Sequence, residues 1–536
     1  MGGPSIPASS FEARLAKWPL LACLAVFLFT IGIRAALLPV LRVPMPAVHD
    51  EFSYLLAGDT YASGRLTNPP LPFWKHFESF HVIQQPTYAS KYPPIQGLVL
   101  ALGYRFFNEP FDQPWIGVWL SAGLMCAAAC WMFQGWTTPS LALIGALLVA
   151  LRVGVLSYWM NSYWGGAVPA IGGALLLGAV PRIAFRRQYA QAATWAIGLA
   201  ILLNSRPYDG AVLAVLSAAV IAWKFTPFSI LATRVALPAA AVLIPVAVFM
   251  LYFNARVTGS PFELPYQLHE RQYGAAPAFA WSSAKQPPIY DHAVMQTFWT
   301  KTNADQVTYM RQHMWSEFLV KLSSMYGFFF CFYPLFLPAL IWPYPLQTPE
   351  ERFGVLLLAG GLLALLPING FQYHYAAALM PLVYLRVLHS IDRLRNWRPN
   401  SKPWGLALAT LLIALIPIQF GRDVWKLFAV GEFAPPMAVP YHNMLRRLEA
   451  LPGRQLVLVR YAPNHDVFQE WVYNRADIDS ARIVWAREMG PSEDAPLIQY
   501  FRGRTVWLLE PDQSPPQLTP YSLTEAESAS LSSRVH

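Results

Sequence analysis

The chain has 536 residues, of which 55% are hydrophobic and 13% are charged, about half the charged fraction that soluble domains usually carry. This composition excludes an array of soluble domains and indicates an integral membrane protein. The net charge is +9, but Lys and Arg flank apolar stretches and form no continuous basic stripe, so nucleic acid is not an expected partner.

Eleven apolar stretches occupy the first 420 residues, and each is close to the length that a membrane helix needs. They are residues 18–41, 115–135, 140–159, 165–182, 190–204, 209–225, 235–253, 323–345, 353–369, 374–391 and 404–420. The first stretch is too long for a signal-peptide core, so we expect an uncleaved signal anchor. The sequence therefore predicts an all-α polytopic membrane domain over residues 1–420, with about eleven transmembrane helices.

Basic residues set the expected orientation of these helices. The strongest cluster, between Arg386 and Lys402, precedes the last apolar stretch. Cytoplasmic loops carry an excess of Lys and Arg, so this cluster predicts a cytoplasmic N-terminus and an external C-terminus. Two long outer loops then follow, residues 42–114 and 254–322, both rich in Pro, Tyr, Trp and His. We expect these loops to fold as caps that carry the active face.

Residues 421–515 read as a small exported α/β domain. A helical pattern at 441–451 precedes strand-like runs at 456–461, 482–488 and 505–511, with a short helical pattern at 494–502. The segment contains no phosphate loop, metal-binding spacing or nucleophile elbow, so we expect it to cap the membrane domain or to recruit a partner. Residues 516–536, rich in Ser and Pro, are expected to be disordered.

The candidate catalytic residues follow the first apolar stretch. His49, Asp50 and Glu51 place two carboxylates beside an imidazole, which can supply a general base for a hydroxyl or amine. We expect Asp50 to be the base and Glu51 to orient it or to help hold a divalent metal ion. The alternative is that His49, Asp50 and Glu51 belong to a solvated turn of the loop and have no catalytic role.

Several cations lie at the same predicted face. Lys91 and Tyr92 precede Pro93-Pro94, which stiffen the end of the first outer loop. Arg206 and Asp209 lie between two predicted spans. Either the two residues form a structural ion pair, or the planar guanidinium of Arg206 binds the phosphate of a ligand. Arg34, near the outer end of the first span, either contacts that phosphate or snorkels to the surface.

His374 and Tyr375, at the outer mouth of a span, complete the expected pocket together with His49, Tyr92 and Asp209. A carboxylate base beside cations at the lipid boundary suits a lipid-phosphate donor, because cations stabilise a leaving phosphate while the carboxylate deprotonates the acceptor. The chain has no nucleotide-binding loop, so a nucleotide donor is not expected.

The first span, the Asp50-Glu51 motif in a long outer loop and Lys91 before Pro93-Pro94 resemble the GT-C superfamily. The resemblance is to bacterial relatives of dolichyl-phosphate-mannose protein mannosyltransferases and of aminoarabinose lipid A transferases. It implies that Asp50 is the base, Glu51 its partner and Lys91 the cation that meets the donor phosphate. Arg206 and His374 match no such motif and depend on the topology argument.

The resemblance implies a multi-pass glycosyltransferase of the bacterial inner membrane that transfers a hexose or pentose, with inversion, from a polyprenyl-phosphate donor. The acceptor is a lipid, a glycan or a protein on the external face. The chain lacks the inserted β-trefoil-like domain of the protein mannosyltransferases, which weakens the argument for a protein acceptor. No cofactor is required by the sequence beyond a possible divalent ion at Asp50 and Glu51.

The alternative function is a transporter or flippase of lipid-linked glycans. A transporter needs charged groups along a path through the membrane and repeated, broken helices, whereas here the charges gather at one face and no internal repeat occurs. Convergence of Asp50, Lys91 and Arg206 at one end of the helices would favour the enzyme, and their dispersal would favour the transporter.

Overall fold

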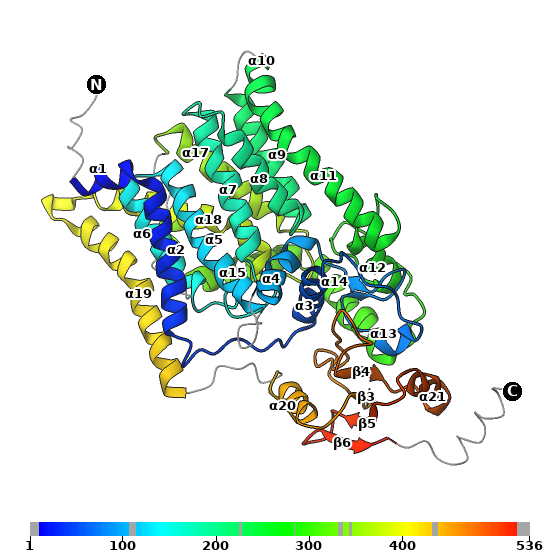
Figure 1. Ribbon diagram of the computed structural model, residues 1–536. Coiled ribbons are helices and arrows are strands. Elements are labelled where there is room, and N and C mark those ends of the chain that lie inside the picture. The colour runs from blue at the N-terminus through cyan, green and yellow to red at the C-terminus, as the bar shows by residue number, and fades with distance from the viewer. Residues whose placement is uncertain are drawn as a thin grey trace.

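The structure is a computed structural model that describes residues 10–106, 114–224, 228–283, 285–330, 336–341, 346–430 and 438–521. Figure 1 shows a bundle of helices with a small α/β unit packed against one end of it. The helices of the bundle are α1 (Ser10–Lys17), α2 (Pro19–Ala36), α5 (Trp115–Trp136), α6 (Pro139–Val149), α7 (Ala167–Ala184), α8 (Gln191–Leu203), α9 (Pro207–Trp223), α10 (Phe228–Ile230), α11 (Leu237–Thr258), α15 (Met314–Phe330), α16 (Phe336–Ile341), α17 (Pro349–Ala364), α18 (Met380–Leu394) and α19 (Trp404–Val430).

Five helical segments in the described residues are long and apolar enough to cross a membrane: Pro19–Ala36, Trp115–Trp136, Ala167–Ala184, Phe228–Thr258 and Trp404–Ala429. The shorter apolar helices Pro139–Gly154, Gln191–Leu203 and Pro207–Trp223 accompany them. A largely helical fold with several apolar helices is therefore confirmed, while the count of about eleven spans stays a prediction.

The centre of the bundle is formed by α5 and α7, whereas α11 lies at its edge. The apolar stretch of α7 is 94% buried, whereas that of the segment Phe228–Thr258, which contains α11, is only 11% buried. Small residues explain the depth of α7, because a Cβ on Gly173 would lie 2.3 Å from the carbonyl oxygen of Ala378. The exposed apolar surface of α11 is left for lipid.

Residues 42–106 fold against one end of the bundle. They form α3 (His49–Ala62), the hairpin β1 (Val82–Ile83) and β2 (Ala89–Ser90), and α4 (Pro94–Phe106). The sequence argument treated Asp50 and Glu51 as part of an extended loop, and this was wrong, because both lie in the first turn of α3. The second outer loop, residues 254–322, contributes α12 (Pro265–Tyr273), α13 (Ala293–Gln296) and α14 (Asn303–Gln312).

The C-terminal unit contains α20 (Ala438–Glu449), β3 (Gln455–Val459), β4 (Ile483–Arg487), α21 (Pro491–Tyr500), β5 (Thr505–Glu510) and β6 (Gln517–Pro520). Its sheet has the order β4-β3-β5-β6, in which β6 alone runs antiparallel to its neighbour. The central strand β3 is buried throughout, which explains its unbroken apolar sequence. The three expected strands are all present.

Two predicted boundaries change. Helix α19 continues to Val430, past the expected boundary at residue 420. Strand β6 lies within the segment that was expected to be disordered, because Gln517–Pro520 pairs with β5. Residues 522–536 of that segment lie outside the described residues.

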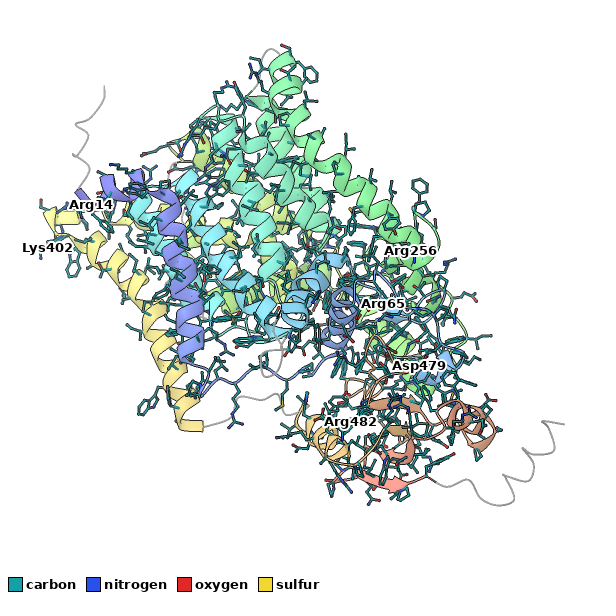
Figure 2. All side chains as sticks on the ribbon, viewed as in Figure 1. Arg14, Arg65, Arg256, Lys402, Asp479 and Arg482 are labelled. Atoms are coloured by element: carbon teal, nitrogen blue, oxygen red, sulfur yellow. The ribbon has the colours of Figure 1, made fainter. Side chains whose placement is uncertain are left out.

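The C-terminal unit packs on the folded outer loops. Arg475 Nε donates to Asp59 Oδ2 of α3 at 2.8 Å, and Arg487 Nε donates to the carbonyl oxygen of Glu78 at 2.7 Å. Figure 2 shows Arg14 and Lys402 at the opposite end of the bundle from Asp479 and Arg482 of this unit. The predicted orientation needs this separation, and the side of the membrane on which each end lies stays a prediction.

Candidate functional site

The first turn of α3 presents Asp50 to the β1–β2 hairpin. The Tyr92 hydroxyl, just after β2, donates a hydrogen bond to Asp50 Oδ1. His81, just before β1, brings its Nε2 to 3.7 Å from Asp50 Oδ2. The hairpin therefore holds the carboxylate from two directions.

His81 has an unusual backbone conformation. Its φ is 64°, in the left-handed region that non-glycine residues seldom adopt. Its carbonyl oxygen accepts hydrogen bonds from Ser53 Oγ at 2.7 Å and from the backbone amide of Lys91 at 3.2 Å. Such strain persists where the surrounding contacts fix it, and it is concentrated at functional sites.

Lys91 lies in a cage of aromatic rings. Its Nζ is 5.2 Å from the ring centre of Tyr92, 5.6 Å from that of Trp299 and 5.9 Å from that of Tyr266. Burial lowers the pKa of Lys91 to about 8, although Asp50 and Glu270 oppose that shift. A cation with so little water around it gains more from binding an anion than an exposed lysine does.

Arg206 precedes α9, between two apolar helices. Its Nε donates to Asp209 Oδ2 at 2.6 Å, so the ion pair that the sequence left open is present. Its guanidinium also lies 3.9 Å from the ring centre of Tyr375. The pair and the ring fix the position of the guanidinium.

His374 and Tyr375 belong to the 3-10 helix η5 (Tyr373–Leu379). The Tyr158 hydroxyl lies 3.0 Å from His374 Nδ1 and accepts from the backbone amide of His374 at 2.9 Å. These bonds hold η5 so that Tyr375 lies beneath Arg206. His374 is therefore a positioning group for this end of the site.

The two halves of the site meet at three tyrosines. Tyr54, Tyr266 and Tyr375 each lie in the electrostatic field of both Asp50 and Arg206. Tyr266 also contacts Lys91 through its ring. Asp50, Lys91 and Arg206 therefore all act on Tyr266, Lys91 through a ring contact, Asp50 through Tyr92, whose ring lies 5.5 Å from that of Tyr266, and Arg206 through its charge.

Glu51 points to different partners from Asp50. Its Oε2 accepts from the amides of Ala47 at 2.7 Å and Val48 at 3.1 Å, and its Oε1 accepts from the amide of Tyr163 at 3.0 Å. Burial raises the pKa of Glu51 to about 7. The carboxyl therefore caps α3 and connects it to the backbone of Tyr163. These contacts do not match the prediction that Glu51 orients Asp50 or helps to hold a metal ion.

The expected metal site is not assembled by these two carboxylates. Asp50 faces Tyr92 and His81, while Glu51 is bonded to backbone amides. Among the described residues, no group of three or more His, Cys, Asp and Glu side chains is placed to hold a metal ion.

Arg34 is fully buried and neither snorkels nor reaches the cage of Lys91. Its Nε donates to Asn161 Oδ1 at 3.0 Å, and its other nitrogens donate to the carbonyl oxygens of Leu41 at 2.8 Å and Arg42 at 3.0 Å. Its guanidinium also lies 4.5 Å from the ring centre of Trp115. These contacts fix the chain as it leaves α2, which is a structural role.

His49 lies beside the site in a stack of rings. Its imidazole is 4.3 Å from the ring of Phe80 and 6.1 Å from that of Phe468, which belongs to the C-terminal unit. Burial lowers the pKa of His49 to about 4, so its ring is neutral. The C-terminal unit therefore contributes directly to the wall of the site.

The sequence argument missed several residues that surround Asp50 and Lys91. They are Tyr54, His81, Tyr266, His269, Trp299, Phe468 and Tyr473. Five of them lie in the two outer loops, whose enrichment in Tyr, Trp and His was the available signal. Nothing in the sequence pointed to Phe468 and Tyr473.

An apolar groove of about 400 Å³ lies between α4, α8 and α11. It is lined by Pro94, Ile95 and Leu98 from α4, by Ile197, Ala200, Ile201 and Asn204 from the end of α8, and by Val242, Pro245, Val246 and Phe249 from α11. Pro94 and Asn204 also line a smaller cavity that reaches Pro93, Pro207 and Tyr266. Tyr266 connects this smaller cavity to the cations, because its ring centre lies 5.9 Å from Lys91 Nζ and the charge of Arg206 acts on its hydroxyl.

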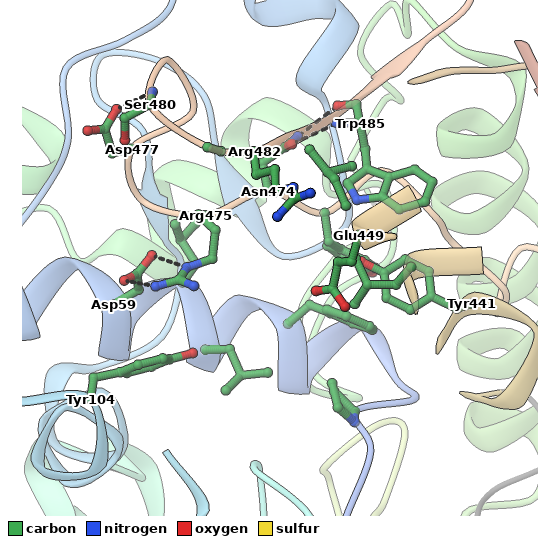
Figure 3. Close-up of a pocket in the computed structure, with 18 of the residues that line it drawn as sticks. Asp59, Tyr104, Tyr441, Glu449, Asn474, Arg475, Asp477, Ser480, Arg482 and Trp485 are labelled. Carbon is green, nitrogen blue, oxygen red and sulfur yellow. Dashed lines mark hydrogen bonds and ion pairs between the residues drawn. The ribbon is translucent and has the colours of Figure 1, made fainter. Parts of the chain in front are cut away.

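A second, polar cavity of about 640 Å³ lies between α3 and the C-terminal unit. Figure 3 shows the Arg475 guanidinium bonded to Asp59, with Tyr104 nearby and Tyr441 and Trp485 further along the cavity. Phe52 and Tyr473 also line this cavity, and their rings stack at 4.1 Å. The charge of Asp50 also acts on Tyr473, so Tyr473 borders both this cavity and the site.

The fold matches that of ArnT from Cupriavidus metallidurans. The apo structure of ArnT is matched with a TM-score of 0.53 and 12% identity, covering 92% of this chain and 93% of ArnT. The structure of ArnT bound to undecaprenyl phosphate is matched with a TM-score of 0.50 and 13% identity over the same shares, 92% and 93%. No protein-family profile and no curated protein matches the sequence.

The oligosaccharyltransferase of Archaeoglobus fulgidus, in complex with zinc and sulfate, is matched more weakly. The TM-score is 0.48 and the identity 12%, covering 90% of this chain and 67% of that one. The likeness to ArnT, a GT-C superfamily member, confirms the resemblance at the level of the fold: the chain has the GT-C fold.

Proposed function

We propose that the protein is a membrane glycosyltransferase that transfers a sugar from a polyprenyl-phosphate donor to an acceptor at the end of the bundle where the C-terminal unit lies. That end would be the external face of a bacterial inner membrane, with the N-terminus in the cytoplasm. The acceptor would be a lipid, a glycan or a protein.

The apolar groove carries this proposal. A polyprenyl chain needs a continuous apolar surface, and its phosphate needs cations at the end of that surface. The groove between α4, α8 and α11 shares Pro94 and Asn204 with the smaller cavity that reaches Tyr266, and the ring of Tyr266 lies 5.9 Å from Lys91 Nζ. The fold shared with ArnT, which has been crystallised with undecaprenyl phosphate, supports the same ligand class.

The surrounding groups suit the transfer step. Asp50 would accept the proton of the acceptor hydroxyl, while the oxygen of that hydroxyl forms a bond to the anomeric carbon of the sugar. The bond between that carbon and the phosphate oxygen breaks, and its electron pair leaves with the polyprenyl phosphate. Lys91 and Arg206 would stabilise the anion that departs. Attack on the face opposite the phosphate inverts the anomeric centre.

The gathering of charges at one end favours this function over transport. Asp50 and Lys91 interact electrostatically, and both Asp50 and Arg206 act on Tyr54, Tyr266 and Tyr375. A flippase would need such groups spread along a path through the membrane. The arrangement found here suits a single reaction centre at the boundary of the lipid.

The test uses the purified full chain in lipid nanodiscs, synthetic undecaprenyl-phosphate sugars and an extract of envelope glycolipids as acceptors. Release of undecaprenyl phosphate is measured by mass spectrometry. We expect release with the wild type and with Asp477→Asn, an exposed control in the C-terminal unit, but little with Asp50→Asn. Translocation of an intact donor in a sealed-vesicle assay, with no release of undecaprenyl phosphate, would instead establish the transporter.

A further inference from the structure

Five buried polar atoms near Asp50 have no hydrogen-bond partner within the described part of the chain. They are His49 Nε2, His81 Nδ1, His269 Nε2, Trp299 Nε1 and the hydroxyl of Tyr473. Each of these side chains belongs to a residue that is at most 8% exposed. Since nearly all buried polar atoms in proteins are paired, these five are available for hydrogen bonds to a bound molecule or to water.

The five groups form one cluster around His81. The His81 ring lies 5.8 Å from that of His49, 6.2 Å from that of His269 and 5.9 Å from that of Trp299. His269 and Trp299 are 5.4 Å apart, and Tyr473 lies 6.5 Å from His49. Together they come from α3, the hairpin, the second outer loop and the C-terminal unit.

The cluster adjoins both the proposed base and the proposed phosphate site. His81 Nε2 is 3.7 Å from Asp50 Oδ2, and Trp299 forms one wall of the Lys91 cage. In a transferase the sugar must occupy this interval, because its anomeric carbon is bonded to the phosphate and is attacked by the deprotonated acceptor. The unpaired atoms therefore border the interval that the sugar would occupy.

The cluster offers hydrogen bonds and aromatic faces rather than charge. Burial lowers the pKa of His49 to about 4 and holds the pKa values of His81 and His269 well below the usual range. The three imidazoles are therefore neutral near pH 7, and Trp and Tyr carry no charge there. Phe80 and Phe298 complete the wall with apolar rings.

We propose that these five side chains form the sugar subsite and that the sugar is an uncharged, hydroxylated monosaccharide. This inference rests on the proposed function. The carboxylate of an acidic sugar would lie near Asp50 while Lys91 and Arg206 are already engaged by the phosphate, and an ammonium group would lie near Lys91. A charge buried without its own partner is far more costly than a hydroxyl that is hydrogen-bonded.

The experiment compares the affinities of five probes for the full chain in nanodiscs. The probes are undecaprenyl phosphate alone and its conjugates with a neutral hexose, a neutral pentose, a uronic acid and an amino sugar. We expect a neutral sugar to bind at least about tenfold more tightly than undecaprenyl phosphate alone, and the two charged sugars to gain nothing.

Tyr473→Phe removes a single hydroxyl and keeps the stacked ring. It should weaken binding of the preferred neutral donor about three- to tenfold and leave undecaprenyl phosphate unchanged. His269→Phe keeps a ring but removes both nitrogens, and provides a second variant if the first unfolds. Tyr500→Phe is the matched control, because that hydroxyl contacts Asp479 on the surface of the C-terminal unit.

The possible failures are distinct. If undecaprenyl phosphate itself does not bind, both the proposed function and the proposed sugar subsite are wrong. If it binds but no sugar adds affinity, or if Tyr473→Phe and His269→Phe leave every conjugate unchanged, the cluster holds water and the sugar subsite is wrong. If a charged sugar binds most tightly, the inferred substrate class is wrong while the transferase proposal stands.

Discussion

Asp50 and Glu51 are neighbours in the chain, yet their carboxylates bind separate sets of partners. Asp50 accepts from Tyr92 and faces His81, whereas Glu51 accepts from the amides of Ala47, Val48 and Tyr163. The first arrangement leaves a partly exposed carboxylate beside the Lys91 cage, and the second uses a buried carboxylate to cap α3. The two residues should therefore fail in different ways when they are substituted.

Asp50→Asn should abolish turnover with little effect on folding, because asparagine is nearly isosteric but cannot accept the proton. The expected loss in transfer rate is about a hundred- to ten-thousand-fold. Glu51→Gln should instead lower the thermal midpoint, because one amide acceptor replaces two carboxylate oxygens that bind three backbone amides. Its activity per folded molecule should stay near that of the wild type. Equal loss of turnover in both variants, at unchanged stability, would contradict the separate roles.

Lys91 should make the binding of lipid phosphate depend on pH. Its pKa of about 8 in the unliganded protein means that the ammonium form dominates below that pH and the neutral amine above it. Affinity for undecaprenyl phosphate should therefore fall as the pH rises through about 8, and binding above that pH should take up a proton. Titration calorimetry in two buffers of different ionisation enthalpy measures both effects. Lys91→Arg keeps its charge throughout, so its affinity should lack this fall.

Binding of the donor should depend on the planar guanidinium of Arg206 and not only on its positive charge. Asp209 and Tyr375 fix the guanidinium, and lysine cannot reproduce both contacts. We expect Arg206→Ala to weaken donor binding roughly ten- to a hundredfold, and Arg206→Lys to recover only part of that loss. The measurement is the dissociation constant for undecaprenyl phosphate, with thermal midpoints as the control. Lower protein yield with unchanged affinity would leave the ion pair with a purely structural role.

Two ion pairs of the C-terminal unit should differ sharply in their effect on stability. Glu470 Oε2 and Arg487 Nη2 lie 2.5 Å apart, and the two side chains are 0% and 3% exposed. Glu470→Gln therefore removes the counter-charge that is paired with this buried guanidinium. The expected cost is about 3–5 kcal/mol in the free energy of unfolding. Asp59→Asn should cost about 1 kcal/mol or less, because its partner Arg475 has a side chain 63% exposed. Limited proteolysis of the C-terminal unit in increasing urea compares the two variants.

The termini should lie on opposite sides of the membrane. Arg14 and Lys402 lie at the end of the bundle away from the C-terminal unit, which fits a cytoplasmic N-terminus. A periplasmic phosphatase fused after His536 should therefore be active, and a fluorescent protein that matures only in the cytoplasm should be dark there. The reverse result would place the whole site on the cytoplasmic face.

The sequence was sufficient for the features that depend on composition and on short motifs. Apolar stretches predicted the helices because membrane helices need long apolar runs, and the motifs pointed to Asp50 and Lys91, which interact electrostatically in the structure. The capping role of Glu51 was missed because Val48 has no side-chain oxygen, so the usual Ser or Thr signal of a helix start is absent. The start of α3 was therefore mistaken for an extended loop.

The remaining parts of the site depend on tertiary packing. Tyr266 and Trp299 reach Lys91 only because the second outer loop folds over the hairpin, and loops carry no periodicity that fixes such a path. Tyr473 reaches Phe52 and His49 from a segment more than four hundred residues away along the chain. A single sequence gives no measure of such distant proximity.

The stacking of Tyr473 on Phe52 has a consequence for biosynthesis. During translation the helices from α2 to α19 can enter the bilayer before residues 438–521 have left the ribosome. At that stage the imidazole of His49 lacks the rings of Phe468 and Tyr473 beside it. A chain that ends before residue 438 would therefore lack part of the wall of the proposed site, and we expect it to be inserted but inactive. Ribosome stalling near residue 438 would yield a membrane-embedded protein without activity.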